Sequence, residues 1–252
     1  MWGKYRLWEY YADFFCNRGF RFIAPTLRYH FPGNQRVKEL GRTSVNDYVA
    51  DIAQLIRYLS ECGLPAMQID PLPPPIVFGH SMGGLIAQKI ASYGIASLTV
   101  LLNSAPPAGV SLHADLRYQL TMLRYLPYFI LGKPFKPSFH AVSYYVMNNI
   151  PESERLEHYR HMVYESGRAA WEIRTEKISV DFSKITCPLL IIGAEKDRIV
   201  PCRVAKDIYK QTAYTGATFQ IYEKFAHRIQ VEPDWEEAAE DIYSWIKEKV
   251  RL

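Results

Sequence analysis

The chain of 252 residues is long enough for one large domain, or for one domain with an insertion. Hydrophobic residues make up 48% of it and charged residues 22%, which are ordinary values for a globular protein with a sizeable core. The net charge of +4 is small and the basic residues form no run, so composition argues against a nucleic-acid-binding protein.

The cysteines lie far apart without C-x-x-C spacing, so we expect reduced thiols rather than a disulfide framework or a zinc site. They are Cys16, Cys62, Cys187 and Cys202. No stretch approaches 18 uninterrupted apolar residues, which predicts that no helix crosses a membrane. No signal peptide is visible, and the reduced thiols favour a cytoplasmic location.

Short apolar runs alternate with longer segments of helical periodicity along most of the chain. The apolar runs predict strands at 20–25, 74–81, 98–105, 187–197 and 218–225. The periodic segments predict helices at 5–18, 45–61, 82–94, 203–213 and 234–249. Continuous apolar runs are typical of strands buried on both faces, and their alternation with helices indicates an α/β fold with a mostly parallel sheet.

One block, residues 110–183, breaks this alternation because it contains no convincing strand. Leucines recur there at helical spacing between 112 and 126, and further helical patterns follow at 152–165 and 167–177. We therefore expect a helical insertion between two strands of the sheet. The core then comprises residues 1–109 and 184–252.

The segment VFGHSMGGLIA, residues 77–87, places Ser81 in a G-x-S-x-G pentapeptide. An apolar run precedes the serine and a helical pattern follows it, which is the strand–turn–helix context of a nucleophile elbow. Gly79 and Gly83 would leave room for so sharp a turn, and the turn would strain the Ser81 backbone. It would also aim the Met82 N–H at a developing oxyanion. A plain glycine-rich turn capped by a serine is the alternative.

A serine hydroxyl needs a base that removes its proton, and the base needs a third group that orients it. Asp197 follows an apolar run in the segment IIGAEKDRIVP, on what we expect to be a loop. His227 lies in FAHRIQVEP, on the loop behind the last predicted strand. These two residues are the candidate acid and base, and Glu195 is the alternative acid on the same loop as Asp197.

With these residues and their motifs, the sequence resembles the α/β-hydrolase superfamily, in its lipase, esterase and lysophospholipase-like group. The chain order serine, aspartate, histidine is that of the family. The motifs are GHSMGG around the serine, G-x-x-x-D-x-I-V-P at residues 193–201, and H-x-x-x-x-E-P at residues 227–233. The stretch GFRFIAPTLRYH is also similar to a family segment, although Thr26 replaces the usual acid and Tyr29 the usual glycine.

The resemblance implies a serine hydrolase with a helical cap, and it implies no metal or organic cofactor. Ser81 would attack an ester carbonyl, His227 would carry the proton, and Asp197 would orient His227. The Met82 N–H would hold the oxyanion. Aromatic residues outnumber charged ones over 111–149, so we expect a small apolar ester as substrate. Esters with an apolar acyl chain or an aromatic group fit, lysophospholipid-like esters included.

The start of the chain departs from the family pattern. The family's sheet begins with three strands, and a His-Gly turn after the third supplies a second oxyanion N–H. Residues 1–15 instead resemble the family segment that lies directly after that turn. We therefore expect a fragment that lacks these N-terminal strands and the turn, with Met1 in the place of the second oxyanion donor. Two central strands would then stay unpaired or pair directly.

Other functions remain compatible with the pattern. An acyltransferase or a cofactor-free haloperoxidase would use the same triad. A catalytically impaired fragment or a non-catalytic binding protein would share only the scaffold. Dehalogenases and epoxide hydrolases of the superfamily place an aspartate at the elbow, so Ser81 argues against both.

Several polar residues outside the triad have two interpretations each. His80 is expected to be structural, with its side chain turned away from the pocket. His158, His161 and Glu165 lie at i, i+3 and i+7, a spacing that suits a metal site, although a solvated helix face explains them better. The polar cluster 165–168 could contact a substrate head group or form a plain junction between two helices.

Overall fold

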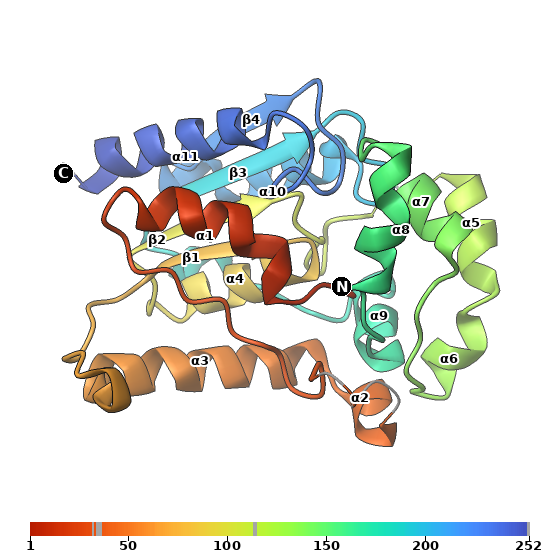
Figure 1. The fold of residues 1–252 in the computed structure, drawn as a ribbon, viewed down its shortest axis with the longest axis horizontal. Coiled ribbons are helices and arrows are strands. Elements are labelled where there is room, and N and C mark those ends of the chain that lie inside the picture. Colours follow the sequence, from red (N-terminus) through yellow and green to blue (C-terminus); the bar gives the residue numbers. More distant parts are fainter. Residues whose placement is uncertain (32, 34–36, 113–114, 251–252) are drawn as a thin grey trace.

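The computed structural model describes residues 1–31, 33, 37–112 and 115–250. In this part of the chain the sheet is formed by parallel strands in the order β1-β2-β3-β4 (Figure 1). They are β1 (Ile76–His80), β2 (Leu98–Leu102), β3 (Leu189–Ala194) and β4 (Thr218–Tyr222). In register, Phe78 lies opposite Val100, and Ile191 lies opposite Phe219. The predicted α/β fold with a parallel sheet is therefore confirmed.

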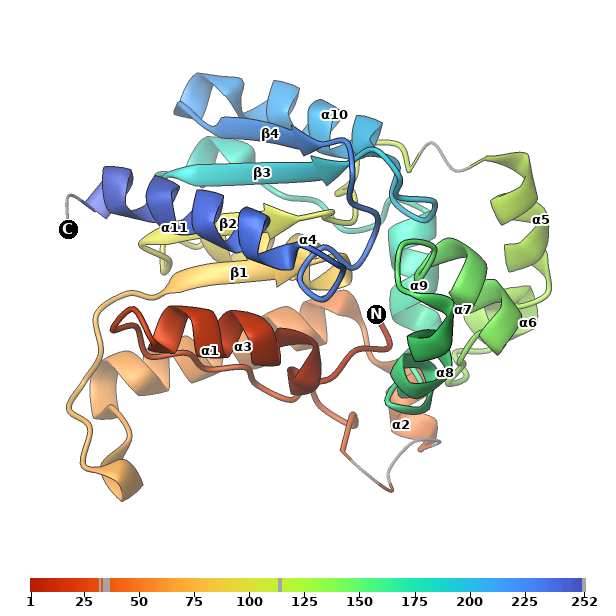
Figure 2. The ribbon, with the colours of Figure 1, turned by 45° about the horizontal axis from the view of Figure 1, so that its top comes forward.

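Helices cover both faces of this sheet (Figures 1 and 2). Val100 and Leu102 point to the face covered by α1 and α11, and Leu101 points to the face covered by α4 and α10. The helices are α1 (Glu9–Cys16), α3 (Val45–Cys62), α4 (Met82–Ser92), α10 (Cys202–Thr212) and α11 (Trp235–Val250). Shorter pieces are η1 (Tyr5–Trp8), α2 (Lys38–Arg42), η2 (Pro65–Met67) and η4 (Ala213–Thr215). Helix α3 packs on α4, so it forms an outer layer on that face.

The described residues of the segment 110–183 form a group of helices beyond the carboxyl ends of the strands (Figure 1). These are α5 (Leu116–Leu123), α6 (Leu126–Ile130), α7 (Phe139–Tyr145), α8 (Glu152–Arg160) and α9 (Gly167–Arg174), with η3 (Phe182–Lys184) before β3. This helical segment therefore stands over the edge of the sheet where the loops after β1, β3 and β4 emerge. None of the described helices is both long enough and apolar enough to span a bilayer.

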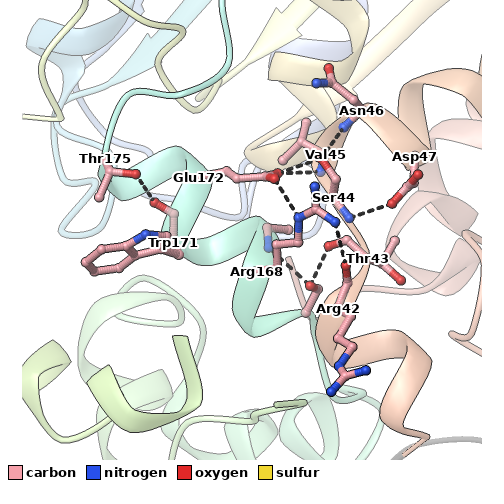
Figure 3. A network of polar contacts seen from close by, with 12 residues as sticks. Arg42, Thr43, Ser44, Val45, Asn46, Asp47, Arg168, Trp171, Glu172 and Thr175 are labelled. Atoms are coloured by element: carbon pink, nitrogen blue, oxygen red, sulfur yellow. Dashed lines mark hydrogen bonds and ion pairs between the residues drawn. The ribbon is translucent and has the colours of Figure 1, made fainter. Parts of the chain in front are cut away.

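Helix α9 is anchored to the first turn of α3 through Glu172 (Figure 3). One oxygen of its carboxylate accepts hydrogen bonds from Ser44 Oγ at 2.8 Å and Val45 N–H at 2.9 Å. The other oxygen accepts one from Arg168 Nε at 2.9 Å. Ser44 also caps α3, together with the Asp47 carboxylate that binds the Ser44 N–H at 2.8 Å. The helical segment is thus fixed to the core at an N-terminus, where a carboxylate is favourable.

Residues 20–25 do not form the predicted strand. They are extended, but within the described residues they pair with no strand, and a cavity of about 1050 Å³ lies between them and β1. Phe22 packs instead against Phe78 and Trp8, with ring centroids 6.2 and 6.3 Å away. From the sequence, the two central strands are expected either to stay unpaired or to pair directly with each other. The structure has the unpaired arrangement, because ring packing rather than a hydrogen-bonded ladder holds residues 20–25.

Candidate active site

Ser81 stands at the turn between β1 and α4. Its backbone has φ 56° and ψ −122°, and a positive φ costs a residue with a side chain about 1–3 kcal/mol. Two backbone hydrogen bonds tie it to the end of β2 and the loop that follows: Ser81 N–H donates to Leu102 O at 3.1 Å, and Ala105 N–H donates to Ser81 O at 2.8 Å. The strained turn predicted from the pentapeptide is therefore confirmed.

The glycines around Ser81 are required for different reasons. A Cβ at Gly79 would collide with the backbone of Gly83 and Gly84, where α4 crosses β1. A Cβ at Gly84 would collide with Ser104. A Cβ at Gly83 would meet open space, so the prediction that Gly83 must lack a side chain is wrong. Close packing of α4 against the strands needs glycine at 79 and 84 instead.

Asp197 and His227 meet on the loops that follow β3 and β4. His227 Nδ1 lies 2.7 Å from Asp197 Oδ2, and both side chains are buried. The other carboxylate oxygen of Asp197 accepts the N–H groups of Ile199 at 2.9 Å and Val200 at 2.8 Å. With a carboxylate at Nδ1, the favoured neutral tautomer of His227 carries its proton there, which leaves Nε2 as an unprotonated acceptor.

His80, the residue that precedes Ser81, contacts His227. The rings of His80 and His227 have centroids 4.7 Å apart, and His80 Nε2 lies 2.6 Å from the His227 carbonyl oxygen. Within the described part of the chain, the Ser81 hydroxyl has no side-chain hydrogen bond. The structure therefore joins Asp197 to His227 and brings His80, the residue before Ser81, against His227 at the carboxyl edge of the sheet.

Burial and nearby positive charge set the protonation of His227. Burial, the amino terminus and the Arg228 guanidinium together bring the pKa of His227 well below its ordinary value. Burial raises the pKa of Asp197 well above its ordinary value, while the N–H groups of Val200 and Ile199 oppose that shift. His227 is consequently neutral at neutral pH, in the form that can accept a proton.

The predicted oxyanion donors lie at the start of α4 and at the start of the chain. Met82 is the first residue of α4, and an N–H group in the first turn of a helix has no acceptor within the helix. The amino group of Met1 is buried, which lowers its pKa, and its charge lowers the pKa of both His80 and His227. Both groups thus lie near the site, and their role as oxyanion donors stays a prediction.

Glu165 takes part in a buried polar cluster that sequence reasoning missed. Its carboxylate lies 3.2 Å from His30 Nε2 and accepts the Tyr48 hydroxyl and the Ser166 N–H, each at 2.8 Å. Burial alone would raise the pKa of Glu165, but the charge and hydrogen bond of His30, the amino terminus and the Ser166 N–H lower it to about 2. These contacts join the helical segment to α3, as a junction between helices would. Glu165 and His30 lie 135 residues apart, so no spacing could have paired them.

The other candidate residues have separate partners. Asp197, and not Glu195, contacts His227, since the Glu195 side chain lies beside Cys202. His158 and His161 pair with acids of their own helix rather than with Glu165. Those acids are Glu154, at 3.9 Å, and Glu157, at 2.7 Å.

Comparisons with known proteins agree with this geometry. The family described as "Serine aminopeptidase, S33" matches residues 5–234. An uncharacterized abhydrolase domain-containing protein of Dictyostelium discoideum is 22% identical over 183 residues, which are 70% of this chain and 19% of that protein. A monoacylglycerol lipase of Mycolicibacterium smegmatis is 24% identical over 221 residues, which are 85% of this chain and 74% of that protein. The chain thus spans less than a fifth of the first relative.

A solved structure of similar fold is an esterase from Exiguobacterium antarcticum, with a TM-score of 0.68 at 18% identity. The match covers 97% of this chain and 88% of that one. A likeness at this identity establishes the fold, and the family match extends over most of the sequence. The chain therefore has the α/β-hydrolase fold and belongs to the serine aminopeptidase S33 family.

Proposed function

We propose that this chain hydrolyses carboxylic esters through a triad of Ser81, His227 and Asp197. The observation that carries the proposal is the buried His227–Asp197 hydrogen bond of 2.7 Å, which lies beside a strained Ser81 turn. Family membership supports it, and so do the names of two similar proteins, a monoacylglycerol lipase and an esterase.

In the acylation step, His227 Nε2 takes the proton of the Ser81 hydroxyl while Oγ bonds to the ester carbonyl carbon. The Met82 N–H, with Met1 as the proposed second donor, stabilises the negative charge that develops on the carbonyl oxygen. His227 then gives its proton to the leaving alkoxide as the C–O bond breaks, which releases an alcohol and leaves an acyl-Ser81. Asp197 stabilises the imidazolium that exists between these two transfers.

In the deacylation step, His227 takes a proton from water, and the water oxygen attacks the acyl carbon. The Ser81 oxygen leaves and recovers a proton from His227, so the free enzyme and a carboxylic acid result. Burial favours this cycle because it keeps His227 neutral, and a neutral imidazole is needed at the start of both steps.

We propose that the helical segment 110–183 serves as a cap and that the substrate is a small apolar ester. The position of this segment, beyond the carboxyl ends of the strands, supports that role (Figure 1). Some of its aromatic side chains are buried, in a cluster that also includes residues of the core. Those that are buried are Tyr118, Tyr125, Phe129, Phe135 and Tyr145. An apolar acyl chain, an aromatic ester or a lysophospholipid-like ester fits a cap of this composition.

The cysteines support a cytoplasmic location, which we propose for the chain. All four are free thiols, and two of them, Cys16 and Cys62, are exposed. Exposed unpaired thiols are typical of reducing compartments.

A fluorophosphonate probe tests the proposal because it reacts with activated serines. We expect labelling at Ser81, loss of labelling in Ser81→Ala, and a melting temperature for that variant within a few degrees of the parent. Ser92→Ala is the matched control, since Ser92 is a buried serine on α4 whose hydroxyl only binds the Lys89 carbonyl. Labelling that persists in Ser81→Ala, or turnover of p-nitrophenyl esters by that variant, would place the nucleophile elsewhere.

A further inference from the structure

The loop that carries His227, residues 226–228, is buried, and side chains from several elements form hydrogen bonds to its backbone. Ala226 is fully buried, His227 is 3% exposed and Arg228 is 9% exposed. Its backbone lies outside the sheet, so strand pairing does not fix it. One backbone hydrogen bond, from the Val231 N–H to Arg228 O at 2.8 Å, holds the end of the loop, and hydrogen bonds from side chains hold the rest of its backbone.

Glu232 binds the amide side of this loop. One oxygen of its carboxylate accepts the Ala226 N–H at 2.7 Å, and the other accepts the Arg228 N–H at 2.8 Å. Both residues that flank His227 are thus held by one side chain, which is itself fully buried. Asn149, from the chain between α7 and α8, donates to the same carboxylate at 2.9 Å.

Asn103 and His80 bind the carbonyl side of the same loop. Asn103 Nδ2 donates to Ala226 O at 2.8 Å and to His227 O at 3.2 Å. His80 Nε2 donates to His227 O at 2.6 Å, because a carbonyl can only accept. These donors stand at the ends of β2 and β1, the latter next to Ser81, so they tie the position of His227 to the sheet that also fixes the nucleophile.

We propose that Glu232 is a positioning residue for His227, and that it acts with Asn103 and His80 to fix the imidazole against Asp197 and Ser81. Three N–H donors converge on Glu232, and a carboxylate, which only accepts, can satisfy all three. An amide at this position would turn an NH₂ group toward a donor, so Gln is not equivalent. This inference rests on the proposed function, and it adds residues that touch neither the substrate nor the reacting atoms.

The test compares Glu232→Gln with Gln230→Met in the esterase assay. Gln230, two residues beyond this loop, is a matched control, because it is fully buried and its side-chain polar atoms have no partner among the described residues. A displacement of about 1 Å can cost about 10²-fold in rate, so we expect Glu232→Gln to lower kcat by about 10- to 100-fold. KM should stay within about threefold, since Glu232 lies behind His227 and not against the substrate. Gln230→Met should keep the kcat of the parent.

Proton NMR tests the position of His227 relative to Asp197 independently of catalytic activity. The proton between His227 Nδ1 and Asp197 should give a downfield resonance in the parent chain and in Gln230→Met, and the resonance should shift or vanish in Glu232→Gln. Asn103→Ala, which removes donors from the other side of the loop, should change both readouts in the same direction and serves if Glu232→Gln does not fold. A parent chain with the resonance but without esterase activity would refute the proposed function alone. A Glu232→Gln chain with parental kcat, or with an unchanged resonance, would overturn the positioning role.

Discussion

Asp197 binds His227 with one carboxylate oxygen while its other oxygen is occupied by the backbone of its own loop. The His227 contact is 2.7 Å, and the loop contacts, from Ile199 and Val200, are 2.9 and 2.8 Å. The loop bonds fix the rotation of the carboxylate, so the oxygen that faces His227 is already in place before substrate binds. Such preorganisation is what a base-orienting residue needs.

Asp197→Asn should therefore cripple ester hydrolysis and Glu195→Gln should not. An amide at 197 can no longer select the Nδ1–H tautomer of His227, and comparable replacements in serine hydrolases lower kcat by about 10⁴. The Glu195 side chain lies beside Cys202 and not on the Asp197–His227 hydrogen bond, so its amide variant is the matched control on the same loop. The measurement is kcat on a p-nitrophenyl ester. A crippled Glu195→Gln with a near-normal Asp197→Asn would exchange the two assignments.

The acidic limb of the pH–rate profile should move when Arg228 is replaced, because the charge of Arg228 lowers the pKa of His227. In the parent chain kcat/KM should fall only below about pH 6.5, because burial and nearby charges lower the pKa of His227 from that ordinary value. Arg228→Met removes a positive charge that opposes the imidazolium, so the pKa of His227 should rise and the limb should move to higher pH. Arg203→Met is the control, since Arg203 is exposed on α10. A limb that stays in place or moves to lower pH would contradict the charge argument.

The two glycines beside Ser81 should respond in opposite directions to alanine. Gly79→Ala drives a methyl group into the backbone of Gly83 and Gly84, so stability should fall by about 1–3 kcal/mol or more. Gly83→Ala places the methyl in open space within a helix, where alanine is favoured over glycine by about 1 kcal/mol. Urea unfolding of both variants measures the contrast. Equal destabilisation by the two substitutions would show that the packing of α4 is not what selects glycine at 79.

Strands and helices whose own residues show an apolar run or a helical periodicity could be predicted from the sequence. The apolar run that ends at Ser81 and the helical pattern behind it became β1 and α4, and the loops of Asp197 and His227 brought those residues together. Residues 20–25 show the limit of this reasoning. Apolar character indicates burial, and Phe22 is partly buried against neighbouring rings, but a strand also needs a partner that the residues themselves do not specify.

Contacts between distant residues could not be predicted in the same way. A side chain is excluded at Gly84 but not at Gly83, because Ser104 packs against Gly84. That contact between α4 and Ser104 exists only in the folded chain. Tyr29 adopts φ 63°, the left-handed region in which the family pattern places a glycine, so the turn is kept although the residue that favours it is absent. The sequence motif 227–233 includes Glu232, but its role becomes visible only through the N–H groups that converge on it.

The buried pair of His30 and Glu165 should make the stability of the chain depend on pH in a defined window. The pKa of Glu165 is lowered to about 2, so its contribution is complete above its ordinary value of about 4.3 and is lost as pH falls toward 2. Burial lowers the pKa of His30, but Glu165 and the Arg28 carbonyl raise it more, and the net shift is upward. The contribution of His30 is therefore complete below about pH 6.5 and is lost as pH rises through the raised pKa.

Glu165→Gln should consequently destabilise the chain most at about pH 5–6, where both partners are charged, and less on either side. Removing one partner of a buried ion pair typically costs about 3–5 kcal/mol, and urea unfolding at a series of pH values measures the difference from the parent. Glu157→Gln is the control, because Glu157 forms an exposed pair with His161 that should contribute under about 1 kcal/mol. A difference between parent and Glu165→Gln that stays constant from pH 4 to pH 9 would mean that packing, rather than the charge of the His30–Glu165 pair, accounts for the contribution of Glu165 to stability.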